Sequence, residues 1–363
     1  DSSKNAMSIV AAADYTLTFR PGKEPEDLDG FFQKLEAFYH QDQILITKPT
    51  KKGERQVIRR RYYPAFQKGG VTGIVASIFV DSQYLPYGAL SVAMEQISAL
   101  HCEIEETPDL LMLCTSADDF LRAAETGKIG FLLSFEGAEP VSSCLLLHGF
   151  YAAGVRGLGL AWSRRNAAAD GCDFSGSLKK GGLTEFGREL VKEAEDLHMI
   201  LDLSHLSDEG VEDVLSITSC PVIASHSNSR AVAGSNRNLT DCQMREIASR
   251  GGTVGLNGCS LLTAGPGVSP DQNGLTAHLD HMTEIMGEDH VAFGFDFCDS
   301  FFADDLSSST DQMPERPFDI LSGAHENLPA FLDHLRQHGY TESHLAKLAG
   351  ENWLHTFRHI LKH

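Results

Sequence analysis

Histidine and carboxylate side chains stand at the ends of five short apolar runs in this 363-residue chain. These residues are His40, Asp42, Glu136, His205, His226 and Asp296. Three imidazoles and two or three carboxylates are ligands that suit zinc or a similar divalent ion. With Glu136 as a bridge, the set is large enough for two ions that share a water, and a hydroxide generated there is a strong nucleophile at neutral pH. The combination predicts the chemistry of hydrolysis.

The apolar runs have the composition of strands that are buried on both faces. Seven of the eight are largely apolar, as expected for a parallel sheet, whereas the first contains Glu36 and also allows a helix. The eight runs are residues 35–42, 69–80, 128–137, 155–162, 199–205, 221–227, 251–257 and 290–296.

Amphipathic segments alternate with these runs and have the pattern of helices. Two of them begin at residues suited to cap a helix, Ser116 and Thr184. Eight strands that alternate with helices predict an α/β fold, a (β/α)8 TIM barrel rather than an open doubly wound sheet. The helical segments are residues 116–125, 142–153, 184–197, 207–216, 240–249 and 275–286.

The barrel is predicted to form one hydrolase domain over residues 35–363. Residues 7–34 are expected to form an N-terminal extension packed on the barrel. The polar segment 299–322, rich in Ser, Asp and Pro, is expected to be a long loop after the eighth strand, where long loops are commonly functional. Residues 1–6, which precede Met7, are typical of an expression-tag remnant.

A barrel explains how candidate ligands that are distant in the sequence come together. The carboxyl ends of all the strands point to one face, so side chains that end different strands converge there. His40 and Asp42 are two residues apart, and on a strand they project to the same side, as two ligands of one ion must.

Each candidate ligand also has a purely structural interpretation. A His-x-Asp motif arises by chance, and the second copy in this chain, His278–Asp280, is expected on an exposed helix face. His205 and His226 could each be a hydrogen-bonded core histidine; their joint position at the ends of consecutive predicted strands favours a site. A carboxylate at the end of an apolar strand is costly to bury, so Glu136 is expected to have a partner or a metal.

Charge and composition exclude several classes of partner. Lys and Arg number 30 and Asp and Glu number 50, which gives a formal net charge of −20 and argues against nucleic acid and anionic membranes. No apolar run approaches the roughly 18 residues that a transmembrane helix needs. The eight cysteines form no CxxC pair and no signal peptide is visible, which favours a cytoplasmic protein; an export signal removed from the sequence is the alternative.

Several motifs, in this order and spacing, together resemble the renal, or membrane, dipeptidase family of zinc metallopeptidases in the amidohydrolase superfamily. The resemblance runs from about residue 38 to the C-terminus and is closest to a bacterial-type member. The motifs are SFEG at 134–137, LDLSHLS at 201–207, PVIASHSN at 221–228, RNL at 237–239 and FGFDF at 293–297.

The resemblance implies a site with two metal ions, for which zinc is the expected element. His40 and Asp42 would be ligands of one ion. Glu136 would bridge it to a second ion, which His205 and His226 would also hold. If the first motif is not a true match, because Phe38 replaces the usual aspartate, a site with one metal remains.

Further residues acquire roles from the same resemblance. Arg237 matches the arginine that grips the carboxylate of the substrate, and Asp296 matches the carboxylate that moves the proton from the attacking water to the leaving amine. Trp162 stands where mammalian members have a histidine thought to stabilise the tetrahedral intermediate, so we count it as a substrate-binding residue. Arg164 and Arg165 are expected in a solvated loop, with compensation for that histidine as the alternative.

The sequence therefore predicts a zinc-dependent dipeptidase that acts on short peptides, with L,D-dipeptides as candidate substrates. A homodimer is a further expectation, because dimers are frequent in the family. One alternative is an amidohydrolase that acts on another amide, a lactam or a lactone. A second alternative is a catalytically silent barrel used for binding.

Overall fold

A curled parallel sheet is the centre of the protein. The computed structural model describes residues 9–12, 56, 58–80, 84–172, 180–297 and 319–362. Within these ranges the sheet has nine strands: β1 (Ile9–Ala12), β2 (Gly73–Ile78), β3 (Leu111–Leu113), β4 (Ile129–Glu136), β5 (Val155–Gly159), β6 (Ile200–Asp202), β7 (Ile223–Ala224), β8 (Thr253–Leu256) and β9 (Val291–Phe293).

The strands follow the sheet in nearly the order of the chain. The sequence of neighbours is β1-β2-β4-β5-β6-β7-β8-β9, and every pair is parallel. β3 pairs with the first residues of β4, and β5 pairs with the last ones. All the carboxyl ends therefore lie on one rim of the sheet.

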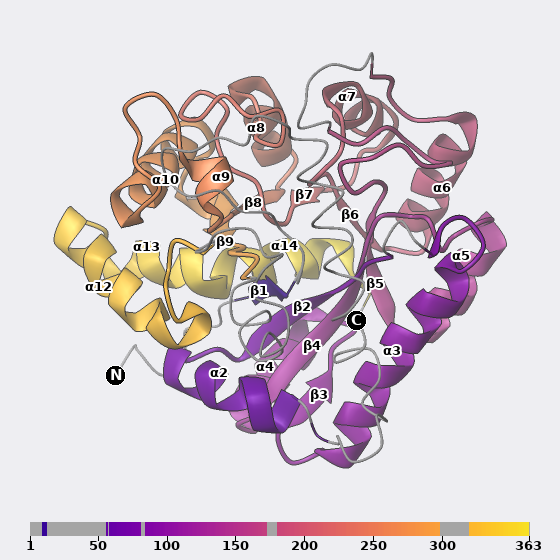
Figure 1. Ribbon diagram of the computed structural model, residues 1–363, viewed down its shortest axis with the longest axis horizontal. Coiled ribbons are helices and arrows are strands. Elements are labelled where there is room, and N and C mark those ends of the chain that lie inside the picture. The colour runs from indigo at the N-terminus through magenta and orange to yellow at the C-terminus, as the bar shows by residue number, and fades with distance from the viewer. Residues whose placement is uncertain are drawn as a thin grey trace, which may run out of the picture.

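The closed eight-stranded barrel expected from the sequence is found only in part. β1 and β9 lie at the two edges of the sheet, and the described residues contain no backbone pairing between them. The strands nevertheless curl around a common centre in Figure 1, with helices around them. The architecture is a curled parallel α/β sheet, which gathers strand ends on one rim as a closed barrel does.

Seven of the eight predicted strands are present. The first, at residues 35–42, lies outside the described residues; β1, from within the expected N-terminal extension, pairs with β2 instead. β3 was not predicted, because three residues are too short a run to show a period. The polar segment 299–322 lies outside the described residues up to position 318.

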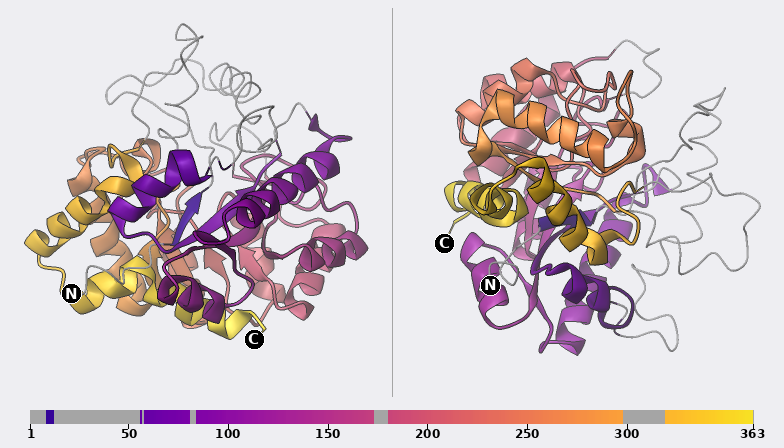
Figure 2. Two further views of the ribbon diagram at one scale, coloured as in Figure 1. Left: turned by 90° about the horizontal axis from the view of Figure 1, so that it is seen from below. Right: turned by 90° about the vertical axis from the view of Figure 1, so that its left-hand side faces the viewer.

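Helices surround the sheet, with α10 and α12 on one flank and α3 and α6 on the opposite flank (Figures 1 and 2). No helix in the described ranges is long and apolar enough to cross a bilayer. The helices are α2 (Tyr63–Gly69), α3 (Ala89–Glu106), α4 (Ala117–Glu125), α5 (Cys144–Ala152), α6 (Glu185–Asp196), α7 (Asp208–Ile217), α8 (Asp241–Ser249), α9 (Ser260–Thr263), α10 (Gln272–Met286), α12 (Leu328–His338), α13 (Glu342–Ala346) and α14 (Asn352–Ile360).

Side-chain caps set where the predicted helices begin. The Ser116 hydroxyl accepts a hydrogen bond from the Asp119 amide at 3.2 Å, and the Asp119 carboxylate accepts one from the Ser116 amide at 3.1 Å. Thr184 caps α6 by accepting from the Gly187 amide at 3.0 Å. Both caps satisfy backbone donors that the first turn of a helix leaves unpaired, which confirms the two predicted starts.

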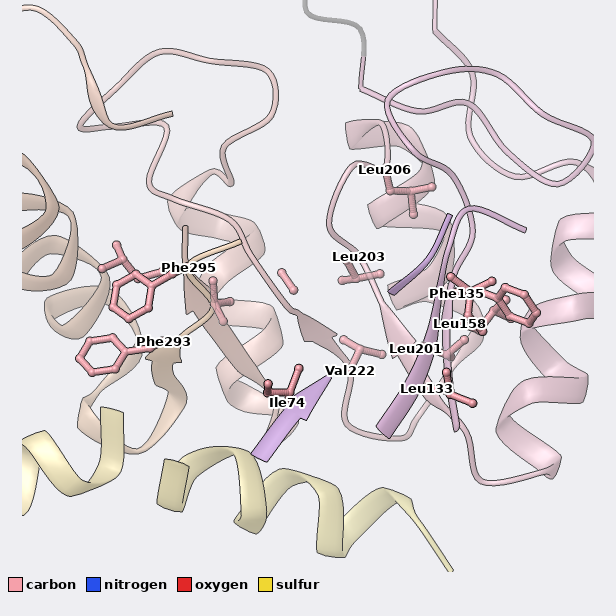
Figure 3. Packing of buried hydrophobic residues seen from close by; sticks show 14 of the residues in the cluster. Ile74, Leu133, Phe135, Leu158, Leu201, Leu203, Leu206, Val222, Phe293 and Phe295 are labelled. Atoms are coloured by element: carbon pink, nitrogen blue, oxygen red, sulfur yellow. The ribbon is translucent and has the colours of Figure 1, made fainter. Parts of the chain in front are cut away.

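The core fills both faces of the sheet. All eight residues of β4 are buried, as the apolar pattern predicted. Figure 3 shows the larger cluster, in which Leu133 and Phe135 of β4 lie close to Leu158 of β5. A second cluster joins strand residues to α14 through Val75, Leu132, Ile200, Ile223, Ala292, Trp353 and Phe357.

His278 corrects one expectation from the sequence. Its side chain is fully buried rather than on an exposed helix face, although Asp280 of the same motif is exposed. The Nδ1 atom accepts a hydrogen bond from the Ser229 amide at 3.1 Å, and Nε2 lies 3.1 Å from the Thr263 carbonyl oxygen. His278 thus joins α10 to the segments after β7 and β8, and burial lowers its pKa from 6.5 to about 4.

We predict that this histidine makes the stability of the protein depend on pH. Between pH 6.5 and about 4 the unfolded chain binds a proton at His278 and the folded protein does not. The free energy of unfolding therefore falls as the pH decreases through this range, by at most about 3 kcal/mol from this group. Denaturant unfolding of the wild type and of His278→Gln at pH 7 and pH 5 measures the effect.

His278→Gln is expected to be less stable than the wild type at pH 7 but to lose less stability on acidification. The matched control is His355→Gln, at an exposed position of α14, which is expected to keep the wild-type dependence. Equal losses in the wild type and in His278→Gln would contradict the prediction.

Candidate metal centre

Five predicted site residues lie at, or two or three residues beyond, the carboxyl ends of strands. Glu136 is the last residue of β4, and Trp162 comes three residues after β5. His205 comes three residues after β6, His226 two residues after β7, and Asp296 three residues after β9. The parallel topology therefore carries all five to the same end of the sheet, as the sequence predicted for Glu136, His205, His226 and Asp296.

Glu136, His205 and His226 form a compact and buried cluster. Their ligand atoms all lie within 4.8 Å of one another. The Oε1 atom of Glu136 is 2.8 Å from His205 Nε2 and 3.3 Å from His226 Nε2, and the two Nε2 atoms are 2.9 Å apart. Two imidazole nitrogens and a carboxylate thus point at a common position.

Burial determines the protonation of this cluster. It raises the pKa of Glu136 to about 8, although the nearby Arg237 guanidinium acts in the opposite direction. It lowers the pKa of His226 to about 4, and it holds the pKa of His205 well below its usual value, where Arg237 adds to the effect. Both imidazoles are therefore neutral at physiological pH, which is the form that binds metals.

The cluster fits a divalent cation. Both carboxylate oxygens of Glu136 are buried without a hydrogen bond of standard geometry from a described residue, and the Ser77 side chain favours the charged form less than burial opposes it. A buried carboxylate without such bonds is unfavourable unless a cation balances it. Two neutral imidazoles and one carboxylate are also the donor set that zinc takes in hydrolytic sites.

The backbone is strained at this site. His205 has a φ of 71°, Asp296 a φ of 56° and Ser163, in the loop after β5, a φ of 42°. Non-glycine residues rarely adopt such values, which cost roughly 1–3 kcal/mol each and occur where the surrounding structure holds them. Three of the six such residues in the described chain are thus at or beside the candidate centre.

Asp296 lies fully buried beside this cluster. Its Oδ2 atom is 3.4 Å from the Asn257 Nδ2 atom, and its charge opposes the lowering of the His226 pKa. Asn257 follows β8 and also accepts a hydrogen bond from the Cys259 amide at 2.7 Å. The carboxylate is therefore oriented by an amide on the neighbouring strand end.

Arg237 reaches both histidines, although it is distant from them in the sequence. Its guanidinium donates from Nη2 to the His226 carbonyl oxygen at 2.7 Å, from Nη1 to Ser227 Oγ at 2.8 Å, and from Nε to His205 Nδ1 at 3.1 Å. The side chain is only 3% exposed. The structure thus brings a positively charged guanidinium to the cluster of Glu136, His205 and His226.

Trp162 covers another side of the cluster. Its ring centroid lies 5.7 Å from that of His205 and 5.1 Å from that of Phe79. The indole N–H is buried and has no hydrogen-bond partner among the described residues. An unpaired buried donor costs about 1–3 kcal/mol, so this position is suited to a group that arrives with a ligand.

Arg164 corrects the expectation of a solvated loop. Its side chain is mostly buried and lies over the Trp162 ring, with 5.4 Å between the guanidinium carbon and the ring centroid. The Nε atom donates to the Glu139 carboxylate at 2.8 Å. Arg165 is exposed, as expected, and pairs with Asp170.

Two glycines allow β8 and the segment after β9 to approach the backbone of Ser225, the residue before His226. A Cβ atom on Gly255 would lie 2.0 Å from the Ser225 carbonyl oxygen, and one on Gly294 would lie 1.8 Å from it. Both distances are far below van der Waals contact, so only glycine fits at either position. The end of β7 is thus enclosed by β8 and by the segment after β9.

The structure does not test every predicted ligand. His40 and Asp42 lie outside the described residues, so the first metal position remains a prediction. Sequence reasoning also missed the residues that support the ligands: Ser163, Asp202, Ser204, Ser225 and Ser227. For Asp202, Ser204, Ser225 and Ser227 the only signal was their position beside the histidines within LDLSHLS and PVIASHSN, and Ser163 had none.

Comparisons with known proteins agree with this site. Residues 60–362 match the membrane dipeptidase family, peptidase family M19. An uncharacterised protein in the pqqA 5′ region of Klebsiella pneumoniae is 33% identical over 283 residues, which cover 76% of this chain and 98% of that protein. Dipeptidase verJ of Clonostachys rogersoniana is 31% identical over 219 residues, or 60% of this chain and 55% of that protein.

Solved structures give the same assignment. The crystal structure of a dipeptidase AC, a metallopeptidase of family M19, has a TM-score of 0.72 at 29% identity and covers 91% of this chain and 96% of its own. A metallopeptidase from Rhodobacter sphaeroides, bound to a phosphinate mimic of L-Ala-D-Ala, has a TM-score of 0.73 at 27% identity and covers 98% and 100%. This chain therefore belongs to the membrane dipeptidase family, peptidase family M19, and is a metal-dependent dipeptidase.

Proposed function

We propose that this dipeptidase uses two zinc ions and acts on dipeptides with a free carboxyl terminus, including L,D-dipeptides. The observation that carries the proposal is the buried cluster of Glu136, His205 and His226, whose ligand atoms lie within 4.8 Å of one another. His205 and His226 would hold one ion, and His40 and Asp42 the other. Bound divalent ions polarise a carbonyl group and activate water for attack on it.

Glu136 is suited to bridge the two ions. Its Oε1 atom faces both histidines, at 2.8 and 3.3 Å. Its Oε2 atom is buried without a hydrogen bond of standard geometry from a described residue. One oxygen would thus serve the ion held by the histidines, and the other is available for the second ion.

Arg237 would bind the carboxylate of the substrate. A metal ligand at His205 Nε2 requires the ring proton on Nδ1, and the Ser163 hydroxyl oxygen, 2.8 Å away, can accept a hydrogen bond from that N–H. In that tautomer Nδ1 no longer accepts from Arg237 Nε, which then has a donor to offer the substrate. A buried guanidinium is suited to a carboxylate because it donates two parallel, charge-assisted hydrogen bonds.

Asp296 and Trp162 would act on the reacting amide. Asp296 would carry the proton from the attacking water to the leaving nitrogen; its burial beside His226 supports this role. The indole N–H of Trp162, which lies next to His205 and has no partner in the described part of the chain, would donate to an oxygen of the bound substrate. L,D-specificity is supported by the relative that binds a phosphinate mimic of L-Ala-D-Ala.

The remaining expectations also stay proposals. We propose one hydrolase domain over residues 35–363, a TIM barrel, preceded by the extension 7–34, whose strand β1 pairs with β2 at one edge of the sheet. A cytoplasmic location is supported by the free cysteines, since the described residues contain no disulfide. Two further proposals rest on the sequence alone. One is that residues 1–6 are a tag remnant, and the other is that the protein forms a homodimer.

Metal analysis together with a dipeptide panel tests the proposed site. We expect about two zinc ions per chain and hydrolysis of L,D-dipeptides that a chelator abolishes and zinc restores. One ion per chain would exclude His40 and Asp42 as ligands of a second ion. No metal, or no release of amino acids from any dipeptide, would contradict the proposal and favour a silent barrel or another amide substrate.

Arg237→Ala tests recognition of the carboxylate. Loss of a charge-assisted hydrogen-bonded pair costs about 1.5–3 kcal/mol, so KM for a free dipeptide is expected to rise roughly 10- to 100-fold. The matched comparison is the same dipeptide with an amidated carboxyl terminus. The wild type should prefer the free acid, and the variant should not. A preference that persists in the variant would contradict this role, whatever the general loss of activity.

Trp162→Phe removes the indole N–H and retains a ring against His205. We expect kcat/KM for dipeptides to fall about 5- to 10-fold, the effect of one lost hydrogen bond. The chain has two tryptophans, and Trp353 donates to the Phe293 carbonyl oxygen at 2.9 Å, so its indole signal is an internal control. In the 15N spectrum, a phosphinate dipeptide mimic should shift the Trp162 indole signal and leave the Trp353 signal in place. Equal shifts would argue against the contact.

A further inference from the structure

A buried carboxylate lies behind one of the metal ligands. Asp202 is the last residue of β6, and its side chain faces the end of the neighbouring strand β7. The Ser225 hydroxyl donates a short hydrogen bond to Asp202 Oδ2. The same hydroxyl lies 2.6 Å from the Nδ1 atom of His226. Asp202, Ser225 and His226 thus form a continuous chain of hydrogen bonds.

The direction of these hydrogen bonds follows from the chemistry of the three groups. An ionised carboxylate only accepts, so the single proton of the Ser225 hydroxyl points to Asp202. The hydroxyl oxygen is then left to accept from His226, which must carry its ring proton on Nδ1. The lone pair of His226 is consequently on Nε2, the atom that lies 3.3 Å from Glu136 Oε1.

We propose that Asp202 is a positioning residue that acts through Ser225 to hold His226 in the tautomer and orientation required of a metal ligand. This inference rests on the proposed metal site and extends it to a residue that touches neither metal nor substrate. Hydrogen-bonding partners of ligating histidines typically change metal affinity 10- to 100-fold when they are removed. A serine hydroxyl between the carboxylate and the imidazole transmits the same constraint over a longer distance.

The other histidine lacks this constraint. His205 Nδ1 lies 2.8 Å from the Ser163 hydroxyl and 3.1 Å from Arg237 Nε. The Ser163 hydroxyl can donate or accept, whereas Arg237 Nε–H only donates, so these partners do not hold His205 in the Nδ1–H tautomer that a metal ligand needs. His226 is therefore the ligand whose lone pair is preset, and the effect of Asp202 should appear in metal affinity.

Asp202 also has a structural role that an experiment must separate from this one. Its Oδ1 atom accepts from the Ser204 amide at 3.0 Å and from the Ser225 amide at 2.9 Å. The backbone register of β6 and β7 consists of the single pair Asp202–Ile223, so the carboxylate joins the two strands beyond it. Loss of this link lowers stability, whereas loss of the tautomer lowers metal affinity.

Asp202→Asn distinguishes the two roles because it nearly preserves the shape of the side chain. The amide oxygen can still accept from the two backbone amides, but the amide nitrogen donates to the Ser225 hydroxyl. That hydroxyl must then donate to His226 Nδ1, which places the ring proton on Nε2, where it blocks the metal. We expect the dissociation constant for zinc, measured by competition with a chromophoric chelator, to rise 10- to 100-fold.

Three further variants control the experiment. Ser225→Ala removes the relay and should weaken zinc binding, and Ser225→Thr, which keeps the hydroxyl, should restore it. Asp208→Asn is the matched carboxylate control: Asp208, on α7, pairs with Arg230 at 2.7 Å and contacts none of the candidate ligands that the structure describes. It is expected to leave zinc affinity within about twofold of the wild type. Thermal unfolding of each metal-free variant measures the structural contribution separately.

The tautomer itself provides a test without any substitution. In 15N-histidine-labelled metal-free protein at neutral pH, the His226 signals should be those of an Nδ1–H ring, and Asp202→Asn should convert them to an Nε2–H ring. An Nε2–H ring in the wild type, or wild-type zinc affinity in a folded Asp202→Asn variant, would overturn the inference. Absence of zinc binding by the wild type would instead contradict the proposed function.

Discussion

The burial of a carboxylate at the end of a fully buried strand is the constraint on which this site depends. Glu136 closes β4, all of whose residues are buried, and burial raises its pKa to about 8. Such a group is unfavourable in an apolar interior unless a positive charge and ligand geometry compensate. The two neutral imidazoles and the guanidinium of Arg237 surround this carboxylate, and the three ligand side chains fit a divalent cation that would balance its charge. A parallel sheet can bring these compensating groups to Glu136 because the carboxyl ends of its strands lie on one rim.

Serine hydroxyl groups fix the positions of the charged and ligating side chains in this site. Serines stand directly before or after both histidines and hydrogen-bond to Asp202, to His226 and to Arg237. Small polar side chains suit this role because they fit between buried strands and both donate and accept. The site is thus a connected polar network rather than a set of isolated ligands. Its charged members occupy fixed relative positions that single contacts would not impose.

Much of this arrangement could be predicted from the sequence, and the reasons for success and failure are physical. The strands from β4 to β9 are apolar runs that stand out from the polar segments around them. The convergence of Glu136, His205 and His226 follows from parallel topology alone. His278 was misjudged because a helical period identifies two faces, whereas burial on the polar one depends on what packs against it. The left-handed backbone of His205 and the link from Asp202 to His226 depend on tertiary contacts that no spacing encodes.

The glycines at positions 255 and 294 limit which residues near the site can be substituted. Each leaves less than van der Waals distance for a methyl group against the Ser225 carbonyl oxygen. Any side chain there would push apart the strand ends that carry His226 and Asp296, so neither glycine can be replaced without moving these strand ends. Variation in substrate preference must arise elsewhere, in residues such as Trp162 and Arg164 that line the site from longer connections. Directed libraries for altered selectivity belong in the loop after β5.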